Sequence, residues 1–525
     1  MKVGRSIRAV LWLDDVLDVP SVCARPYRST LPCDQSQGVH PGEEELTRME
    51  QQHAVRIDGE AVTTANSMEV RAPFDGRVVG VVPRCDASHV DAAVAAARRA
   101  LRDDPLPAWR RAEILDRAAE LVAEESVFED LARTIALEAA KPITTARAEV
   151  LRCISTFRFA AAACRTVAGE VLPLDAAQAG EGRLGFTLRV PVGVVGAITP
   201  FNFPLNLVAH KLAPAIAAGC PVVLKPAHQT PLTGIKLAEL LLDRCGLPAG
   251  WLHVITGEGR EVGAALVAHD EVAMITFTGS PEVGWSIRSQ AARKKVSLEL
   301  GNNAPVLIQP DGAWEVAAQR IAVAATAHAG QSCISVQRVL VHRDIAEPFL
   351  AALTAAVEAL VVGDPLDDAT QVSALIDEDN RDRVVDWIEE AVAAGASVVT
   401  GGAVGNDGVL GPTVLTDVAP DMRICSTEVF GPVMGVQVYD DVEEAFALAN
   451  DTRYGLQAGI FTADLGVAKR AIEVLDFGGV IVNDVPTWRA DQMPYGGLRD
   501  SGNTREGPVY AMHEMTEVRT AVISG

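Results

Sequence analysis

The fold is decided by the stretch VVGAI at residues 194–198 and by the strand–helix units that follow it. PVVL at 221–224 starts the next unit, and the same alternation returns over 252–269 and 274–292. Apolar strands joined by helices predict a parallel, doubly wound sheet, because such strands are buried on both faces. Ligands bind such sheets at the carboxyl ends of the strands.

A second α/β series runs from about residue 301 to 482, without a register that would make the halves a repeat. The predicted fold class is therefore α/β, with two doubly wound α/β domains. A β-hairpin is predicted over 165–190, and it must pack on another part of the fold or on another subunit. The alternating run at 515–522 predicts one more strand.

Bulk properties exclude several function classes. The chain has 525 residues and a net charge of −23, which argues against nucleic acid or an anionic membrane as a partner. The sequence contains no run of 18 apolar residues, so no membrane-spanning segment is predicted. Nine cysteines without a C-x-x-C pair predict free thiols, no metal site and a reducing, cytoplasmic location.

Four polar residues or turns follow predicted strands of the first sheet. Asn202 lies in TPFNFP at 199–204, Lys225 ends a strand, FTGS at 277–280 turns into a helix, and Glu299 ends another strand. Each has a plain structural interpretation as well: a helix cap, a solvated charge, an ordinary turn and a buried, partnered acid.

Cys333 lies in GQSCIS at 330–335, between a small-residue run and an apolar strand. A thiol at such a junction can lie at the bottom of a cleft, with its backbone N–H free to bind an oxyanion. A lone cysteine is more often a small buried hydrophobe, so the rest of the chain must decide.

Six stretches together resemble the aldehyde dehydrogenase superfamily, in the family's order and spacing, over about residues 55–525. They are PFNFP (200–204), VLKP (223–226), FTGS (277–280), LELG (298–301), GQSC (330–333) and EVFGP (428–432). MPYGG at 493–497 and QSCIS at 331–335 look closest to the branch with lactaldehyde, non-phosphorylating glyceraldehyde-3-phosphate and phosphonoacetaldehyde dehydrogenases.

The resemblance implies a mechanism that the residues fit. Cys333 is the expected nucleophile, Asn202 and the Cys333 N–H the oxyanion donors, and Glu299 the base that activates water. The reaction expected is oxidation of an aldehyde to the acid through a thiohemiacetal and a thioester. The expected cofactor-binding residues are Thr199, Pro200, Phe201, Lys225, Ala227, His228, Gly279, Ser280, Gly284, Leu300, Glu428 and Phe430.

His228 departs from the family's pattern. Many members carry a glutamate three residues after the lysine, where it binds ribose hydroxyls and would repel a 2′-phosphate. Its absence beside Lys225 predicts that NADP is accepted and favoured over NAD. The alternative is that His228 is a surface residue and that NAD still binds better.

The resemblance also implies which residues line the polar funnel through which the substrate reaches Cys333. Its expected residues are Asn206, His210, Ser332, Ile334, Trp488, Arg489 and Tyr495. Arg489 could pair with a carboxylate or phosphate of the substrate, unless Asp491 occupies it. The predicted substrate is a small hydroxy- or anion-bearing aldehyde.

Other readings remain open. Coenzyme A could take the acyl group in place of water, or the chain could keep the fold without catalysis. The resemblance further implies a homodimer or homotetramer. Residues 1–54 are predicted to be a poorly ordered extension. The cofactor-binding domain is predicted over 55–164 and 191–300, and the catalytic domain over 301–485. The oligomerisation arm and C-terminal segment are predicted over 165–190 and 486–525.

Overall fold

The structure, a computed structural model, describes residues 52–524, so nearly all of the extension predicted for 1–54 lies outside it. A five-stranded parallel sheet, in the order β11-β10-β7-β8-β9, forms the first α/β unit. Its strands are β7 (Val194–Ile198), β8 (Val222–Lys225), β9 (Leu252–Val254), β10 (Val272–Thr278) and β11 (Lys295–Glu299). All residues of β7, β8 and β9 are buried, which explains why these strands are apolar apart from Lys225 and His253. The predicted parallel, doubly wound sheet is confirmed.

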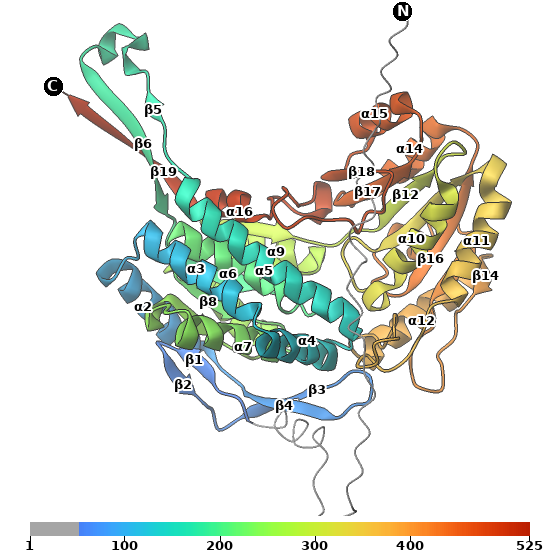
Figure 1. The fold of residues 1–525 in the computed structure, drawn as a ribbon, viewed down its shortest axis with the longest axis horizontal. Helices are drawn as coiled ribbons and strands as arrows, with labels where there is room; N and C mark the ends of the chain where they lie inside the picture. The colour runs from blue at the N-terminus through green and yellow to red at the C-terminus, as the bar shows by residue number, and fades with distance from the viewer. Residues whose placement is uncertain (1–51, 525) are drawn as a thin grey trace, which may run out of the picture. The chain divides into compact units, whose positions relative to one another are not determined.

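Helices cover both faces of this sheet (Figure 1). Strand order runs from β7 to β8 and β9 in one direction, and then to β10 and β11 in the other. Because crossovers are right-handed, this reversal places α6 and α7 on one face and α8 and α9 on the other. Helices α3, α4 and α5 pack on α6 and α7, whereas α2 contacts α8. The helices are α2 (Ala87–Asp103), α3 (Ala108–Val122), α4 (Glu125–Ala139), α5 (Ile143–Thr166), α6 (Asn206–Ala218), α7 (Leu232–Glu239), α8 (Ala264–Ala268) and α9 (Pro281–Gln290).

The second unit is a seven-stranded sheet in the order β14-β15-β16-β13-β12-β17-β18. It is parallel except for β14, which pairs antiparallel with β15 at the edge. Its strands are β12 (Ala304–Ile308), β13 (Val336–His342), β14 (Ser397–Thr400), β15 (Thr413–Thr416), β16 (Val433–Tyr439), β17 (Gln457–Phe461) and β18 (Gly479–Val482). Its helices are α10 (Trp314–Thr326), α11 (Ala346–Glu358), α12 (Glu378–Ala393), α13 (Arg423–Ser426), α14 (Val442–Asn450) and α15 (Leu465–Val474).

The first sheet contributes the carboxyl ends of its strands to the candidate site, and the second sheet contributes the amino ends of its strands. In the first sheet, strand order reverses between β7 and β10, and the loops that follow these two strands carry Asn202 and Gly279. Such a switch point is where open α/β sheets bind ligands. In the second sheet, the loops with Cys333 and Glu428 come before β13 and β16, at the amino ends of the strands.

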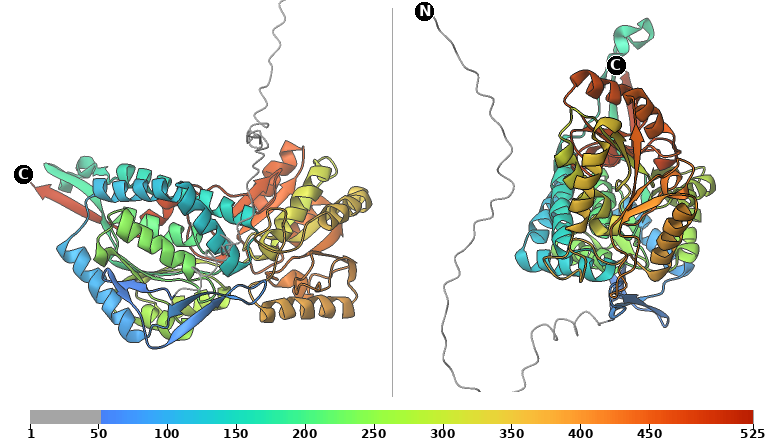
Figure 2. Two further views of the ribbon diagram at one scale, coloured as in Figure 1. Left: turned by 60° about the horizontal axis from the view of Figure 1, so that its bottom comes forward. Right: turned by 90° about the vertical axis from the view of Figure 1, so that its right-hand side faces the viewer.

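A three-stranded antiparallel arm extends away from the sheets (Figures 1 and 2). It consists of β5 (Val171–Leu172), β6 (Arg183–Pro191) and β19 (Thr516–Ser524), with β19 paired to β6 along nine residues. The predicted hairpin and final strand are therefore both present. Helix α16 (Pro508–Glu514) leads into the arm, and the antiparallel pairs β1 (Val55–Ile57) with β2 (Glu60–Val62) and β3 (Ser67–Arg71) with β4 (Val78–Pro83) complete the strands.

Two further findings concern the described part of the chain. None of its helices has both the length and the apolar character needed to cross a bilayer. Its cysteines are all free thiols, and six of these are buried: Cys85, Cys153, Cys164, Cys220, Cys245 and Cys425.

Candidate active site

Residues from both sheets line one pocket around the predicted nucleophile. Cys333 and Ser332 precede β13, and Glu299 ends β11. Five of the seven predicted funnel residues line the pocket, and His210 and Trp488 do not; the five are Asn206, Ser332, Ile334, Arg489 and Tyr495. The pocket is completed by Arg152, Phe203, Leu207, Thr278, Leu300, Leu456 and Glu506.

The backbone before Cys333 is strained. His328, Ala329 and Gly330 have φ values of 51°, 53° and 70°, in the left-handed region that favours glycine. A Cβ on Gly330 would come within 2.0 Å of the Gly431 carbonyl oxygen. The Gln331 side chain then fixes the turn, because its amide donates to His328 O (3.1 Å) and accepts from Ile376 N (2.9 Å).

The Cys333 thiol lies 2.9 Å from the Tyr495 hydroxyl. Burial raises the pKa of this thiol to about 12, against which the Tyr495 hydrogen bond acts. The sulfur is therefore protonated near neutral pH until another group takes its proton. Within the described residues, the Cys333 backbone N–H forms no hydrogen bond.

Asn202 joins the loop after β7 to the cysteine loop. Its side-chain Nδ2 donates to the Gln331 carbonyl at 2.8 Å, which fixes the orientation of the amide. The second Nδ2 hydrogen is left for another acceptor. Oδ1 is buried and has no hydrogen-bond partner among the described residues.

Glu299 is a buried carboxyl with few partners. Oε1 accepts a long hydrogen bond of 3.4 Å from Thr504, and Oε2 has no described partner. Burial, followed by repulsion from Glu506, raises the pKa of Glu299 well above its usual range. This carboxyl therefore keeps its proton to a higher pH than an exposed glutamate does.

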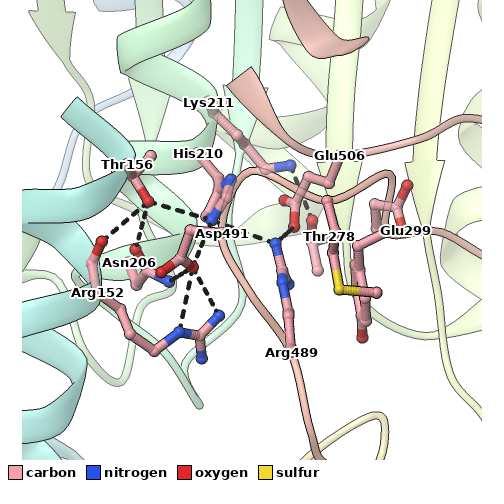
Figure 3. A network of polar contacts seen from close by, with 12 residues as sticks. Arg152, Thr156, Asn206, His210, Lys211, Thr278, Glu299, Arg489, Asp491 and Glu506 are labelled. Atoms are coloured by element: carbon pink, nitrogen blue, oxygen red, sulfur yellow. Dashed lines mark hydrogen bonds and ion pairs between the residues drawn. The ribbon is translucent and has the colours of Figure 1, made fainter. Parts of the chain in front are cut away.

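Asp491 is at the centre of a polar network beside the pocket (Figure 3). Its Oδ1 accepts from Arg152 Nε and Nη2 (3.1 and 2.9 Å) and from Asn206 Nδ2 (3.2 Å), and lies 3.1 Å from His210 Nε2. Burial opposes ionisation, but the contacts from His210 and Arg152 hold the pKa of Asp491 well below its usual range. Asp491, weighed as a partner for Arg489, pairs with Arg152 instead.

Arg489 forms a second ion pair, with Glu506 (2.7 Å), and lies over the Tyr495 ring at 3.8 Å from its centre. Although burial acts the other way, Arg489 lowers the pKa of Glu506 to about 2. His210 Nε2 also lies 3.2 Å from Arg489 Nη2. This nitrogen either donates to Asp491 or accepts from Arg489, so it can serve only one of the two pairs at a time.

Several of these residues were not predicted from the sequence. Lys211 is buried, and its Nζ donates to Thr276 and Thr278 (3.1 and 2.8 Å); a lysine inside the apolar helix α6 was a usable signal. Arg152 and Glu506 carried no signal, because they come from distant segments with ordinary local patterns. Trp488, by contrast, is half exposed and does not line the pocket.

Lys225 is a buried lysine with few polar contacts. It is buried at the end of β8, and within the described residues its Nζ bonds only the Pro226 carbonyl (3.2 Å) and forms no ion pair. Burial lowers its pKa to about 8. Thr199 N–H donates to Lys225 O, so the loop with Thr199 and Pro200 starts beside it. His228, after the buried Ala227, is exposed, and Glu258 acts electrostatically on both Lys225 and His228.

Glu428 and Phe430 lie on the other side of Ser332, with which they line a small cavity. Glu428 accepts from Asn302 N at 3.0 Å, and burial raises its pKa to about 8. Phe430, at a φ of 52°, meets the Phe201 ring edge-on at 5.8 Å between centres.

The first turn of α9 completes this side. Ser280 caps the helix by accepting from Val283 N, and Gly279 N donates to the Glu299 carbonyl. A Cβ on Gly284 would lie 2.4 Å from Leu300, so this glycine permits close packing. A buried lysine without an ion pair in the described chain, the N-terminus of α9 and a buried carboxyl together suit the phosphates and ribose hydroxyls of a dinucleotide. No group of three metal-ligating side chains occurs within residues 52–524.

Comparison with known proteins places the chain among named enzymes. The model of the "Aldehyde dehydrogenase family" matches residues 61–521. A 3-sulfolactaldehyde dehydrogenase of Priestia aryabhattai is 45% identical over 480 residues, which cover 91% of this chain and 99% of that protein.

Two solved structures are similar along nearly their whole length. Aldehyde dehydrogenase 21 from Physcomitrella patens, in complex with its reaction product succinate, has a TM-score of 0.86 at 38% identity, covering 90% of this chain and 98% of that one. The glyceraldehyde-3-phosphate dehydrogenase GapN from Methanocaldococcus jannaschii, complexed with NADP, has a TM-score of 0.84 at 38% identity, covering 88% and 100%.

Proposed function

The chain belongs to the aldehyde dehydrogenase family and is an oxidoreductase, and from that premise we propose that it oxidises a small anionic aldehyde to the carboxylic acid. The observation that carries the proposal is the convergence of Cys333 and Glu299 on a pocket that also contains Arg152 and Arg489. A bound nicotinamide cofactor would accept the hydride that the reaction removes from the aldehyde carbon.

The protein's own groups supply the remaining chemistry. The Cys333 thiol gives its proton to solvent water, and the thiolate forms a bond to the carbonyl carbon. The free Nδ2 hydrogen of Asn202 and the Cys333 N–H stabilise the resulting oxyanion. After hydride loss the acyl group is held as a thioester. Glu299, once ionised, takes a proton from the attacking water, and the thiol leaves as the acid is released.

The charges of the pocket favour an anion on the substrate. Among the residues that line the pocket, Arg152 and Arg489 are cationic and Glu506 is ionised, while burial raises the pKa of Glu299 and so favours its neutral form. Arg489 Nε is buried without a partner, and Arg152 Nη1 forms no hydrogen bond within the described residues. These two donors suit the oxygens of a sulfonate, carboxylate or phosphate. The named relatives act on, or bind as product, molecules that carry such groups.

A substrate screen tests this proposal. Wild-type enzyme should show higher kcat/KM for sulfonate- and carboxylate-bearing aldehydes than for hexanal or benzaldehyde, and Cys333→Ala should lose oxidation of all of them. Arg152→Gln should lower kcat/KM for the anionic aldehydes by about tenfold or more, because it removes a charged hydrogen bond, and leave a neutral aldehyde unaffected. The control is Arg147→Gln. Arg147 lies on the same helix as Arg152, and the change removes its ion pair with Glu129. Equal efficiency with hexanal would contradict the anion preference.

For the cofactor, we propose that NADP is accepted and favoured over NAD. Exposed His228 presents no acid to a 2′-phosphate, and Lys225 lies beside it. Glu258 is the residue that favours the opposite outcome, since its charge acts on both. Comparing kcat/KM for the two cofactors decides the point, and a strong NAD preference would overturn it.

Product analysis with and without coenzyme A separates acid formation from acyl transfer to coenzyme A. A cytoplasmic location, a homodimer or homotetramer, and the domain boundaries remain predictions from the sequence.

A further inference from the structure

A buried ion pair outside the pocket holds the loop that carries Asn202. Lys141 follows α4 and Glu149 lies on α5, and both are almost completely buried. Lys141 Nζ and Glu149 Oε2 are 2.5 Å apart. Burying two charges costs so much solvation that such a pair is weak evidence for stability, so its partners deserve inspection.

Those partners all belong to the segment from Asn202 to Asn206. Lys141 Nζ donates to the Asn202 carbonyl (2.5 Å) and lies 3.8 Å from the centre of the Phe203 ring. Glu149 Oε1 accepts from the backbone N–H groups of Leu205 and Asn206 (2.9 and 3.0 Å). Helix α6 has no side-chain cap from its own N-cap residue, so Glu149 supplies it from another helix.

The held loop is in turn bonded to the cysteine loop. Asn202 Nδ2 donates to the Gln331 carbonyl, two residues before Cys333. Shifting the Asn202 backbone would therefore move the amide relative to the sulfur. An oxyanion donor loses most of its effect when it is displaced by a fraction of an ångström.

We propose that Lys141 and Glu149 are positioning residues that fix the Asn202 amide at the oxyanion of the reaction. The inference rests on the proposed function, in which Asn202 is that donor. It adds two residues that touch neither substrate nor cofactor and act through the backbone of residues 202–206.

The chain offers a matched control in Glu138. This carboxyl is also buried and also caps a helix from a distance, since it accepts from the N–H groups of Leu232 and Thr233 at the start of α7. Helix α7 carries none of the residues assigned to the oxyanion. Glu138→Gln and Glu149→Gln therefore make the same substitution at a carboxyl that caps a helix, and only the second changes a direct contact with residues 202–206.

The experiment is a double-mutant cycle on the rate of reduced-cofactor formation in a single turnover, with aldehyde and cofactor saturating. Lys141→Met and Asn202→Ala should each slow this step by about tenfold or more, with KM values little changed. Together they should be no slower than Asn202→Ala alone, because the first change acts through the second residue. Lys141→Met with Glu149→Gln, which leaves no unpaired charge, should fold and be as slow as Lys141→Met.

The outcomes are distinguishable. If the two effects multiply, or if Glu138→Gln is as slow as Glu149→Gln, the positioning role is overturned while the proposed function stands. If Asn202→Ala itself runs at the wild-type rate, the oxyanion role of Asn202 fails, and this inference fails with it.

Discussion

Glu299 and Glu506 are two buried carboxyls near one another that hold different protonation states. Glu506 has Arg489 at 2.7 Å and is ionised, whereas Glu299 has only a weak hydrogen bond from Thr504. Repulsion between two nearby carboxylates means that the better-paired one keeps the charge. The proton therefore resides on Glu299, the carboxyl that must later act as a base.

Glu299→Gln should separate the two halves of the reaction. A glutamine cannot accept a proton from water, so the thioester would accumulate. Rapid mixing should show a burst of about one reduced cofactor per site, followed by turnover slowed by about 10² or more. In the wild type, kcat should rise with pH as Glu299 ionises, and since burial raises the pKa of Glu299, this rise lies above the usual carboxyl range. A variant without the burst would place Glu299 before hydride loss.

Tyr495→Phe should make the nucleophile less acidic. The Tyr495 hydroxyl stabilises the thiolate, and burial already raises the pKa of Cys333 to about 12. A hydrogen bond to a charged group contributes about 1.5–3 kcal/mol, so losing it should slow alkylation of Cys333 by iodoacetamide about tenfold or more at pH 8. In both proteins the rate should rise with pH, because the thiolate fraction grows until the pKa is passed. Tyr439→Phe, buried in the second unit, is the control; equal slowing there would contradict the role of Tyr495.

At the scale of elements, the turn before Cys333 combines backbone strain with close packing. Three consecutive left-handed residues end at Gly330, which touches the Gly431 backbone. The turn is held from both sides, by Gln331 and by the loop with Gly431. Strain of this kind persists only where the surroundings enforce it, and it aims the cysteine into the pocket.

Gly330→Ala should therefore reduce the free energy of unfolding by more than the strain of a left-handed alanine alone. Gly246 has a similar φ of 77° and nothing within 4 Å of an added Cβ, so Gly246→Ala should cost only about 1 kcal/mol. At Gly330 the Cβ would collide with backbone at 2.0 Å, so Gly330→Ala should cost about 3 kcal/mol or more and abolish turnover. Urea unfolding of both variants measures the difference. Equal costs would mean that the contact with Gly431 gives way easily.

At the scale of the whole molecule, the arm exposes apolar surface that the described chain leaves uncovered. Six of its apolar side chains are about half exposed or more: Val171, Leu184, Leu188, Val518, Val522 and Ile523. Exposed apolar groups on a projecting sheet are typical of a subunit interface, consistent with the dimer or tetramer predicted from the sequence.

Replacing apolar surface on the arm should therefore dissociate the predicted oligomer. Leu184 and Ile523 lie directly opposite each other, so Leu184→Lys with Ile523→Glu keeps a favourable cross-strand pair while it removes apolar area. Sedimentation equilibrium should show smaller species than for the wild type. Leu465→Lys, on a highly exposed side chain of α15, should change nothing. A double variant that remained fully assembled would place the interface elsewhere.

Much of this architecture could be predicted from local patterns. The run at 194–198 and its successors form strands because both faces are apolar, and the polar residues after β7, β8, β10 and β11 meet because parallel strands end at one edge. Helix limits are less predictable: a π-helical turn at 240–244 follows α7, and another at 259–263 precedes α8. Hydrophobic periodicity does not report which backbone hydrogen bond a turn uses.

By itself, then, the sequence determined the fold class and the strands of the arm, which depend on short-range pattern, and its resemblance to the family indicated the candidate triad of Cys333, Asn202 and Glu299. Only the tertiary structure decided how the charges pair. Arg152 meets Asp491 across 339 residues of chain, and Lys141 meets the Asn202 carbonyl across 61. Such contacts leave no periodic trace, since a charged residue has the same local pattern whether it faces water or a buried partner. Long-range packing therefore selects both the anion-binding groups and the pair that holds the Asn202 loop.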